Sequence, residues 1–303
     1  MRLKIFEYLL DNDPVKVISK AGIKIRRSVN GLFRNVMVPL SSRNKLEVVR
    51  RAEVPEDRKI IYAATHGFRD DAAYSLAATG KHSYVLVGAL NIVLDSLWGL
   101  AFWFNGVILV DRFNKESRAS TIDKIRYSLQ QGVSVLMFPE ATWNHSENQL
   151  VLKLFPGIYD AAVLEDALVV PVTTVQEGKK VYAIGDEPFA ISEYSREKGL
   201  EVLRDKLATL KYELMDLYCH AKRSDIGNAK EYWKSFWDKL VDEAKGLYIK
   251  EEEMRSAFVD KTITTYEKAF EHLENIKYDA GNAFLVKKIK SYLRKEEKEE
   301  SPS

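Results

Sequence analysis

The stretch Thr65-His-Gly-Phe-Arg-Asp-Asp71 decides how this chain is interpreted. It follows the apolar run Ile60–Ala64 and precedes the Ala-rich segment Ala72–Ala78, a pattern that predicts a strand, a sharp turn and a helix. His66 falls on the turn. Asp71 falls in the first turn of the helix, where the helix dipole favours a carboxylate.

The two residues have His-x-x-x-x-Asp spacing, which lets the carboxylate accept a hydrogen bond from the imidazole. Such a bond fixes the tautomer and leaves the other ring nitrogen free as a base, as removal of a proton from an alcohol requires. The alternative is a helix-capping pair. The spacing recurs at His220 and Asp225, but no strand precedes that pair, and we interpret it as a solvated helix terminus. His66 and Asp71 are therefore the candidate catalytic pair.

The length and composition of the chain limit the classes of protein to which it can belong. The 303 residues can form one large domain with an appendage, or two domains. The chain has 46% hydrophobic and 30% charged residues, as is typical of soluble globular proteins, and a net charge of +2, which does not point to nucleic acid. A single cysteine, Cys219, excludes a disulfide framework, and no apolar segment of signal-peptide length begins the chain. We expect a cytoplasmic protein.

The N-terminal segment is strongly basic. No Asp or Glu occurs from Pro14 to Lys45, and apolar residues recur there at near-helical spacing. A basic amphipathic helix can lie in a membrane interface with its cations on anionic headgroups. The alternative is a helix that covers the domain core and exposes a solvated basic face.

From Arg58 onward, short apolar runs alternate with helical patterns. The expected strands are residues 60–65, 84–87, 107–110, 133–138, 169–175 and 181–184, and the expected helices are residues 71–79, 92–104, 117–130 and 157–165. This alternation predicts an α/β domain with a mixed, largely parallel sheet flanked by helices. Ligands gather at the carboxyl ends of such strands, where His66, Arg112 and Glu140 are expected.

The apolar stretch Tyr84–Val110 is long enough to span a bilayer. Asp95 lies near its middle, however, and a carboxylate there costs about 3 kcal/mol on insertion scales. We therefore predict a strand, a buried helix and a strand. The aromatic part, Trp98 to Phe104, either reaches the membrane, lines an acyl pocket or forms ordinary core.

We predict three parts in the chain: a basic amphipathic helical membrane-docking segment (1–55), an α/β domain (56–222), and a charged helical extension with a disordered tail (223–303). The apolar stripe Tyr232–Leu240 is interpreted as a packing face. The scattered histidines and single cysteine lack metal-ligand spacing, and no Gly-rich phosphate loop is present. We expect no metal and no bound cofactor.

Four blocks follow one another along the chain: Thr65-His66-x4-Asp71, Gly106-Val-Ile-Leu-Val-Asp111-Arg112, Phe138-Pro-Glu140-Ala-Thr142 and Val169-Val-Pro171-Val-Thr173. Their order and spacing resemble those of the glycerolipid acyltransferases, the lysophosphatidate acyltransferase (PlsC-type) family. The resemblance covers about residues 58 to 190. The basic N-terminal helices also resemble the membrane-docking helical pair of that family.

The resemblance implies that His66 is the general base and that Asp71 orients it and balances its charge. It also implies that Arg112 binds the acceptor's phosphate, since the guanidinium fork matches phosphate oxygens. Glu140 and Thr142 would bind the acceptor's polar head, and Gly157 would allow close backbone approach. From the residues alone, Arg112 can instead pair with a neighbouring carboxylate, and Glu140 can be a loop carboxylate.

The chain departs from the family in its third block. The family pattern is Phe-Pro-Glu-Gly-Thr-Arg-Ser, whereas this chain has Ala141 in place of the glycine and Trp143 in place of the second arginine. Loss of a phosphate-binding cation favours an acceptor other than 1-acyl-glycerol-3-phosphate, with Trp143 stacking on a sugar or lining a lipid groove. The lysine that usually precedes the later glycine is also absent, since Phe155 and Pro156 precede Gly157.

We therefore expect a peripheral acyltransferase at the cytoplasmic face of the membrane. It would move a fatty acyl chain from acyl-CoA or acyl-carrier protein, each a co-substrate, to a lysophospholipid. The preferred acceptor is 1-acyl-glycerol-3-phosphate, in phospholipid biosynthesis. One alternative is another acceptor, such as a lysoglycolipid or a different lysophospholipid. Another is a catalytically silent, membrane-bound adaptor that binds a partner protein through its C-terminal helices.

Overall fold

The computed structural model describes residues 8–10, 13–41, 44–68, 70–88, 97–111, 114–144, 149–219, 231, 235 and 238. The chain divides into two compact units, Met1–Phe258 and Val259–Ser303, and every described residue belongs to the first. The expected C-terminal extension lies outside the described residues except at Glu231, Ser235 and Asp238, which are helical. The predictions for its apolar stripe, its tail and the pair His220 and Asp225 fall outside as well.

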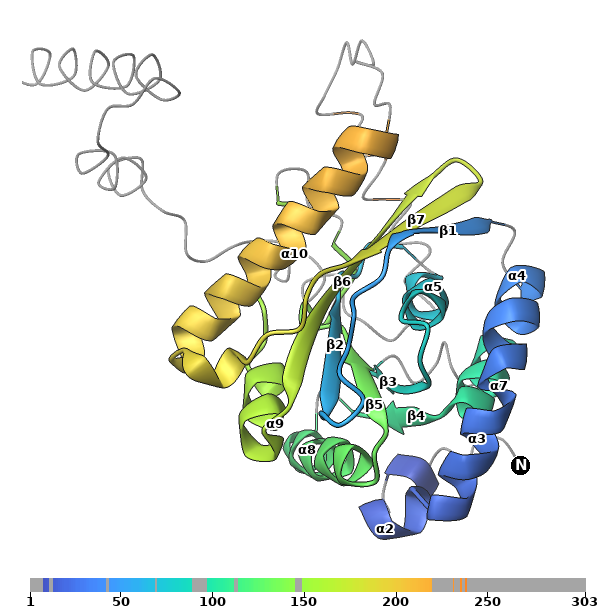
Figure 1. The fold of residues 1–303 in the computed structure, drawn as a ribbon, viewed down its shortest axis with the longest axis vertical. Coiled ribbons are helices and arrows are strands. Elements are labelled where there is room, and N and C mark those ends of the chain that lie inside the picture. Colours follow the sequence, from blue (N-terminus) through green and yellow to red (C-terminus); the bar gives the residue numbers. More distant parts are fainter. Residues whose placement is uncertain are drawn as a thin grey trace, which may run out of the picture. The chain divides into compact units, whose positions relative to one another are not determined.

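Among the described residues, seven strands form one sheet with the order β1-β7-β6-β2-β5-β3-β4 (Figure 1). The strands are β1 (Lys45–Arg50), β2 (Ile60–Ala64), β3 (Ser83–Val87), β4 (Val107–Leu109), β5 (Ser134–Met137), β6 (Leu168–Glu177) and β7 (Lys180–Gly185). The five strands from β6 to β4 are parallel, whereas β7 is antiparallel to β6 and β1 is parallel to β7. The predicted mixed, largely parallel α/β sheet is confirmed.

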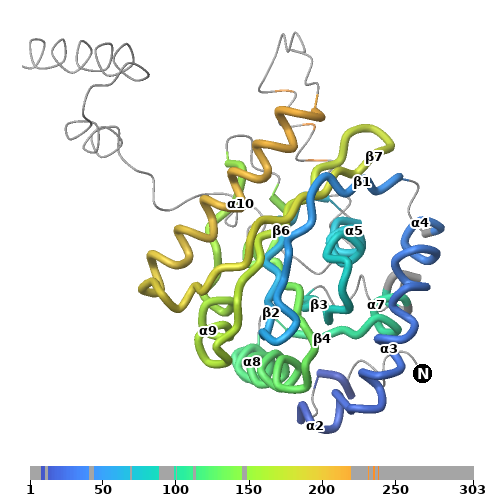
Figure 2. Tube along the Cα trace, in the orientation of Figure 1, coloured from blue at the N-terminus to red at the C-terminus, as the bar shows by residue number. Residues whose placement is uncertain are grey.

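Helices cover both faces of the sheet, as the trace in Figure 2 shows. One face carries α5 (Asp71–Ala78) and α7 (Leu97–Asn105), and the other carries α8 (Lys115–Gln130), α9 (Gly157–Glu165) and α10 (Arg196–Tyr218). Because both faces are covered, central strands are continuously apolar, and all five residues of β2 are buried. This is why the sequence showed them as short apolar runs.

Strand β1 corrects one prediction. The helical segment was expected to reach residue 55, but its helices end at Ser41, and Lys45–Arg50 instead form an edge strand beside β7. An edge strand needs only partial apolar character, and β1 interleaves charged and apolar residues. That interleaving hid the strand within a basic segment.

The stretch from Tyr84 to Val110 folds as predicted where it is described, with β3, the helix α7 and β4 in succession. Residues 89–96, including Asp95, lie outside the described part. Within the part of the chain that the structure describes, no helix is long and apolar enough to cross a bilayer.

The N-terminal helices are α2 (Pro14–Val17), α3 (Lys20–Leu32), the π-helical turn η1 (Phe33–Met37) and α4 (Val38–Ser41). Polar contacts fix α3 to the α/β domain: Asn30 Nδ2 donates to Asn105 Oδ1 at 3.0 Å in a buried bond, and Arg27 donates to the Gly132 carbonyl at 2.8 Å in an exposed one. Arg34 donates to the Gly80 carbonyl at 2.6 Å. The helix therefore covers the domain core, as one of the two alternatives predicted.

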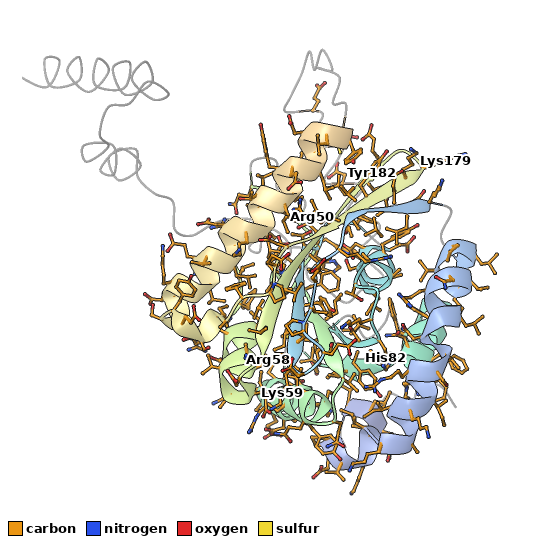
Figure 3. All side chains as sticks on the ribbon, in the orientation of Figure 1. Arg50, Arg58, Lys59, His82, Lys179 and Tyr182 are labelled. Atoms are coloured by element: carbon orange, nitrogen blue, oxygen red, sulfur yellow. The ribbon has the colours of Figure 1, made fainter. Side chains whose placement is uncertain are left out.

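Different side chains lie where the central strands begin and where they end. Arg58 and Lys59, labelled in Figure 3, lie where β2 begins and bind Asp166 at 3.3 Å and Glu165 at 2.8 Å. These ion pairs hold the end of α9 against the start of β2. His66 and the loop that contains Glu140 lie at the opposite ends of the strands, where β2 and β5 end.

Candidate active site

The predicted contact between His66 and Asp71 is present. Strand β2 ends as the Thr65 amide donates to the Val172 carbonyl at 3.2 Å, and the chain then turns through His66 into α5. His66 Nδ1 lies 2.9 Å from Asp71 Oδ1 and 2.8 Å from Oδ2. Because a carboxylate only accepts, Nδ1 carries the proton of this bond and Nε2 is left as the basic nitrogen. The His66 side chain is 22% exposed, whereas that of Asp71 is 0% exposed.

Asp71 also builds the turn that carries His66. Its Oδ2 accepts hydrogen bonds from the amides of Gly67, at 2.7 Å, and Phe68, at 3.1 Å. The helix-capping interpretation and the catalytic interpretation are therefore not exclusive, since one carboxylate closes the turn and orients the imidazole. The buried carboxylate thus accepts hydrogen bonds from three N–H donors.

Glu140 is a second buried carboxylate, with 1% of its surface exposed. Its Oε1 accepts from the His66 amide at 2.9 Å, and its Oε2 accepts from the Leu152 amide at 2.7 Å. Burial raises the pKa of Glu140, and these two amide bonds oppose that effect. We expected Glu140 to hold the acceptor's polar head, but both oxygens bind the chain itself, so its contacts are those of a residue that positions His66.

Two aromatic rings flank the imidazole. The Phe138 ring centroid lies 4.4 Å from that of His66, and the Trp143 centroid lies 5.6 Å away. The Asn144 amide donates to the His66 carbonyl at 2.6 Å, which closes the same loop over the turn. The sequence showed Trp143 only as a departure from the family pattern, and the structure places it beside the candidate base.

The other predicted site residues stand as follows. Thr142 is partly exposed on the turn after Glu140, and Gly157 is the first residue of α9. A Cβ at Gly157 would meet only Ile122 Cδ1, at the ordinary distance of 3.9 Å, so packing within the protein does not require glycine there. Arg112 lies outside the described residues. The substrate-binding roles of all three remain predictions.

Lys211 was not predicted as a site residue; it lies on α10, about seventy residues after Glu140. It interacts electrostatically with Glu140 and Asp71, and burial lowers its pKa while the two carboxylates oppose that effect. One signal was present in the sequence: Lys211 interrupts the apolar face formed by Leu207, Leu210 and Leu214. Among the described residues, no group of three or more His, Cys, Asp or Glu side chains could hold a metal ion.

The turn after β5 contains a strained residue. Ala141 has a φ of +56°, in the left-handed region that favours glycine, and the family pattern has glycine at this position. Strain of this kind is common at functional sites, where the surrounding contacts enforce it. Here the Ala141 amide donates to the Phe138 carbonyl at 3.0 Å, which closes the turn that presents Glu140.

Comparison with known proteins gives consistent matches. The model of the family described as Acyltransferase matches residues 45–175, which include all four blocks. The chain is 24% identical over 184 residues to the 1-acyl-sn-glycerol-3-phosphate acyltransferase of Salmonella typhimurium, covering 57% of this chain and 74% of that protein. It is 25% identical over 178 residues to the protein of the same name from Haemophilus influenzae, covering 54% and 71%. The crystal structure of PlsC, the 1-acyl-sn-glycerophosphate acyltransferase of Thermotoga maritima, superposes with a TM-score of 0.47 at 17% identity, covering 72% of this chain and 89% of that one.

The strain at Ala141 yields a stability prediction. Ala141→Gly should raise the free energy of unfolding by about 1 kcal/mol, because the left-handed conformation costs alanine about 1–2 kcal/mol and glycine's extra chain entropy offsets part of that gain. The control is Ala21→Gly on the exposed face of α3, which should lower it by about 1 kcal/mol. Urea unfolding measures both. A fall for Ala141→Gly as large as that of the control would contradict the strained turn.

Proposed function

We propose that this chain, whose residues 45–175 match the model of the family described as Acyltransferase, acylates the free hydroxyl of a lysophospholipid. The preferred acceptor is 1-acyl-glycerol-3-phosphate, which gives phosphatidate in phospholipid biosynthesis. Support for this acceptor comes from relatives named 1-acyl-sn-glycerol-3-phosphate acyltransferase. The acyl donor is a thioester, either acyl-CoA or acyl-carrier protein, and no bound cofactor takes part.

One observation carries the proposal: the His66 imidazole is held through Nδ1 by a fully buried carboxylate, while the ring itself is partly exposed. A hydroxyl with a pKa far above neutrality is a poor nucleophile until a base removes its proton in the transition state. A neutral imidazole whose Nδ1–H is fixed presents Nε2 for that step. Asp71 then stabilises the imidazolium that forms.

In the proposed reaction, His66 Nε2 takes the proton of the acceptor hydroxyl as the hydroxyl oxygen bonds to the thioester carbonyl carbon. The tetrahedral intermediate collapses, the carbon–sulfur bond breaks, and the thiolate takes the proton back from His66. The products are the ester and the free thiol, so no proton or electron is left over. Glu140 serves this step indirectly, because it binds the His66 amide and thereby sets where the imidazole stands.

Two features of the site bear on the acceptor. We place Arg112 at the acceptor's phosphate, by resemblance to the family. Trp143 stands beside His66 where the family pattern has a second cation. An indole at this position favours a planar or apolar headgroup over a second anionic oxygen. A lysoglycolipid or another lysophospholipid is therefore the second candidate acceptor, with the same chemistry.

We further propose peripheral binding to the cytoplasmic face of the membrane through the N-terminal helices. Large apolar side chains point outward there, with Ile25 63% and Leu40 81% exposed, and Leu32 and Val36 are also exposed. The exposed lysines Lys16, Lys20 and Lys24 lie on the same segment, whereas Arg26, Arg27 and Arg34 bind the α/β domain. Exposed apolar groups beside exposed cations suit an anionic lipid interface.

The proposed reaction is tested by release of free thiol from acyl-CoA and from acyl-carrier protein. Acceptors are lysophosphatidate, lysophosphatidylcholine and a lysoglycolipid. Wild-type protein should release thiol when lysophosphatidate is present, and His66→Ala should lower the rate about 10²- to 10⁴-fold because the base is lost. The control is His82→Gln, since His82 Nε2 binds the Asn105 carbonyl away from the site and glutamine can donate the same bond.

The outcomes of that assay distinguish the possible acceptors, test the role of His66 and separate an enzyme from an adaptor. Release with only a non-phosphorylated acceptor would keep the mechanism and replace the acceptor. Wild-type rates in His66→Ala would contradict the role of His66. Silence with both donors and every acceptor would favour the catalytically silent adaptor.

Membrane binding is tested by sedimentation with anionic phosphatidylglycerol vesicles. The double variant Ile25→Glu, Leu40→Glu should bind at least about tenfold more weakly, because each buried aliphatic side chain contributes about 1.5–3 kcal/mol. Leu164→Glu is the matched control, since Leu164 is also exposed but belongs to α9, outside the N-terminal segment. Equal binding by the double variant and wild type, or an equal loss in the control, would contradict docking through this segment.

A further inference from the structure

The candidate site contains two buried carboxylates close to one imidazole. Asp71 binds the His66 ring and Glu140 binds the His66 amide, and neither carboxylate has appreciable contact with solvent. Backbone amides satisfy part of their hydrogen-bonding capacity, but amides carry no net charge. Two negative charges in a buried region therefore call for a nearby cation.

The position of Lys211 fits this requirement. It lies four residues after Leu207 and three before Leu214, so these side chains share one face of α10, and both leucines are fully buried. The Leu207 carbonyl accepts a hydrogen bond from Thr173 Oγ1 at 3.4 Å. Thr173 follows Val172, the residue that binds the amide just before His66. The part of α10 that carries Lys211 thus packs against the strand ends that present the base.

Other charged residues of α10 near Lys211 have partners outside the candidate site. Lys206 pairs with Asp186 at 3.0 Å, and Glu213 pairs with Arg50 at 3.1 Å. Arg204 donates to the Val151 carbonyl at 3.0 Å. Lys211 itself is partly buried and forms no hydrogen bond or ion pair among the described residues, and the charged groups that act on it are Glu140 and Asp71.

We propose that Lys211 is a positioning residue for acyl transfer, whose ammonium group balances the buried charges of Asp71 and Glu140 and so keeps His66 neutral. This inference rests on the proposed function of the same site. The sign follows from electrostatics: without the ammonium group, the field at His66 becomes more negative and favours the imidazolium. An imidazolium cannot accept the proton of a hydroxyl, so the base is lost at neutral pH while its contacts remain.

The test compares the pH dependence of kcat/KM in wild type, Lys211→Met, Lys211→Arg and Lys206→Met. Lys211→Met should move the acidic limb of the pH profile upward by about one pH unit, the order of magnitude expected for the loss of one charge at an intermediate dielectric. The rate below the limb should fall about tenfold and recover at high pH, with KM unchanged. Lys211→Arg should restore the wild-type limb, and Lys206→Met should leave it in place.

A loss in Lys211→Met that is equal at every pH, or an acidic limb that does not move, would overturn the proposal in favour of a packing role. NMR titration of the His66 imidazole supplies a second readout that needs no substrate. The fraction of His66 rings that is doubly protonated at neutral pH should increase in Lys211→Met and stay at the wild-type value in Lys211→Arg. If the wild-type protein transfers no acyl group, the proposed function fails, and the titration still decides whether Lys211 sets the protonation of His66.

Discussion

The buried carboxylate of Asp71 is the constraint on which the candidate site depends. It binds the imidazole of His66 and two amides of the turn, so the strand β2, the turn and the helix α5 meet at one charged group. Burial of a charge without partners would be strongly unfavourable. The partners are therefore fixed, and with them the direction in which the free nitrogen of His66 points.

Glu140 repeats this arrangement from the neighbouring strand. Because β5 lies beside β2, its loop reaches the His66 amide and links it to Leu152. The strained backbone at Ala141 shapes the turn that makes this possible. The imidazole is thus held through its ring by one carboxylate and through its backbone by another, which is the rigidity expected of a preorganised base.

The sequence predicted the parts of the site that depend on local pattern. The apolar run before His66 and the Ala-rich segment after Asp71 predicted β2 and α5, and the spacing predicted the contact between the two residues. Strand β1 was not predicted, because an edge strand needs no continuous apolar run. The contacts of Glu140 were not predictable, since a motif names a residue but not the direction of its side chain. Lys211 was missed because only the folding of α10 onto the sheet brings it to the site.

The central claim is that Asp71 holds His66 as a neutral imidazole with its proton on Nδ1. Nitrogen-15 NMR of the His66 ring at neutral pH tests this most directly, because protonated and unprotonated ring nitrogens have well-separated shifts. We expect a protonated Nδ1 and an unprotonated Nε2 in the wild-type protein, and loss of that tautomer preference in Asp71→Ala. A wild-type ring protonated on Nε2 alone, or a preference unchanged in Asp71→Ala, would contradict it.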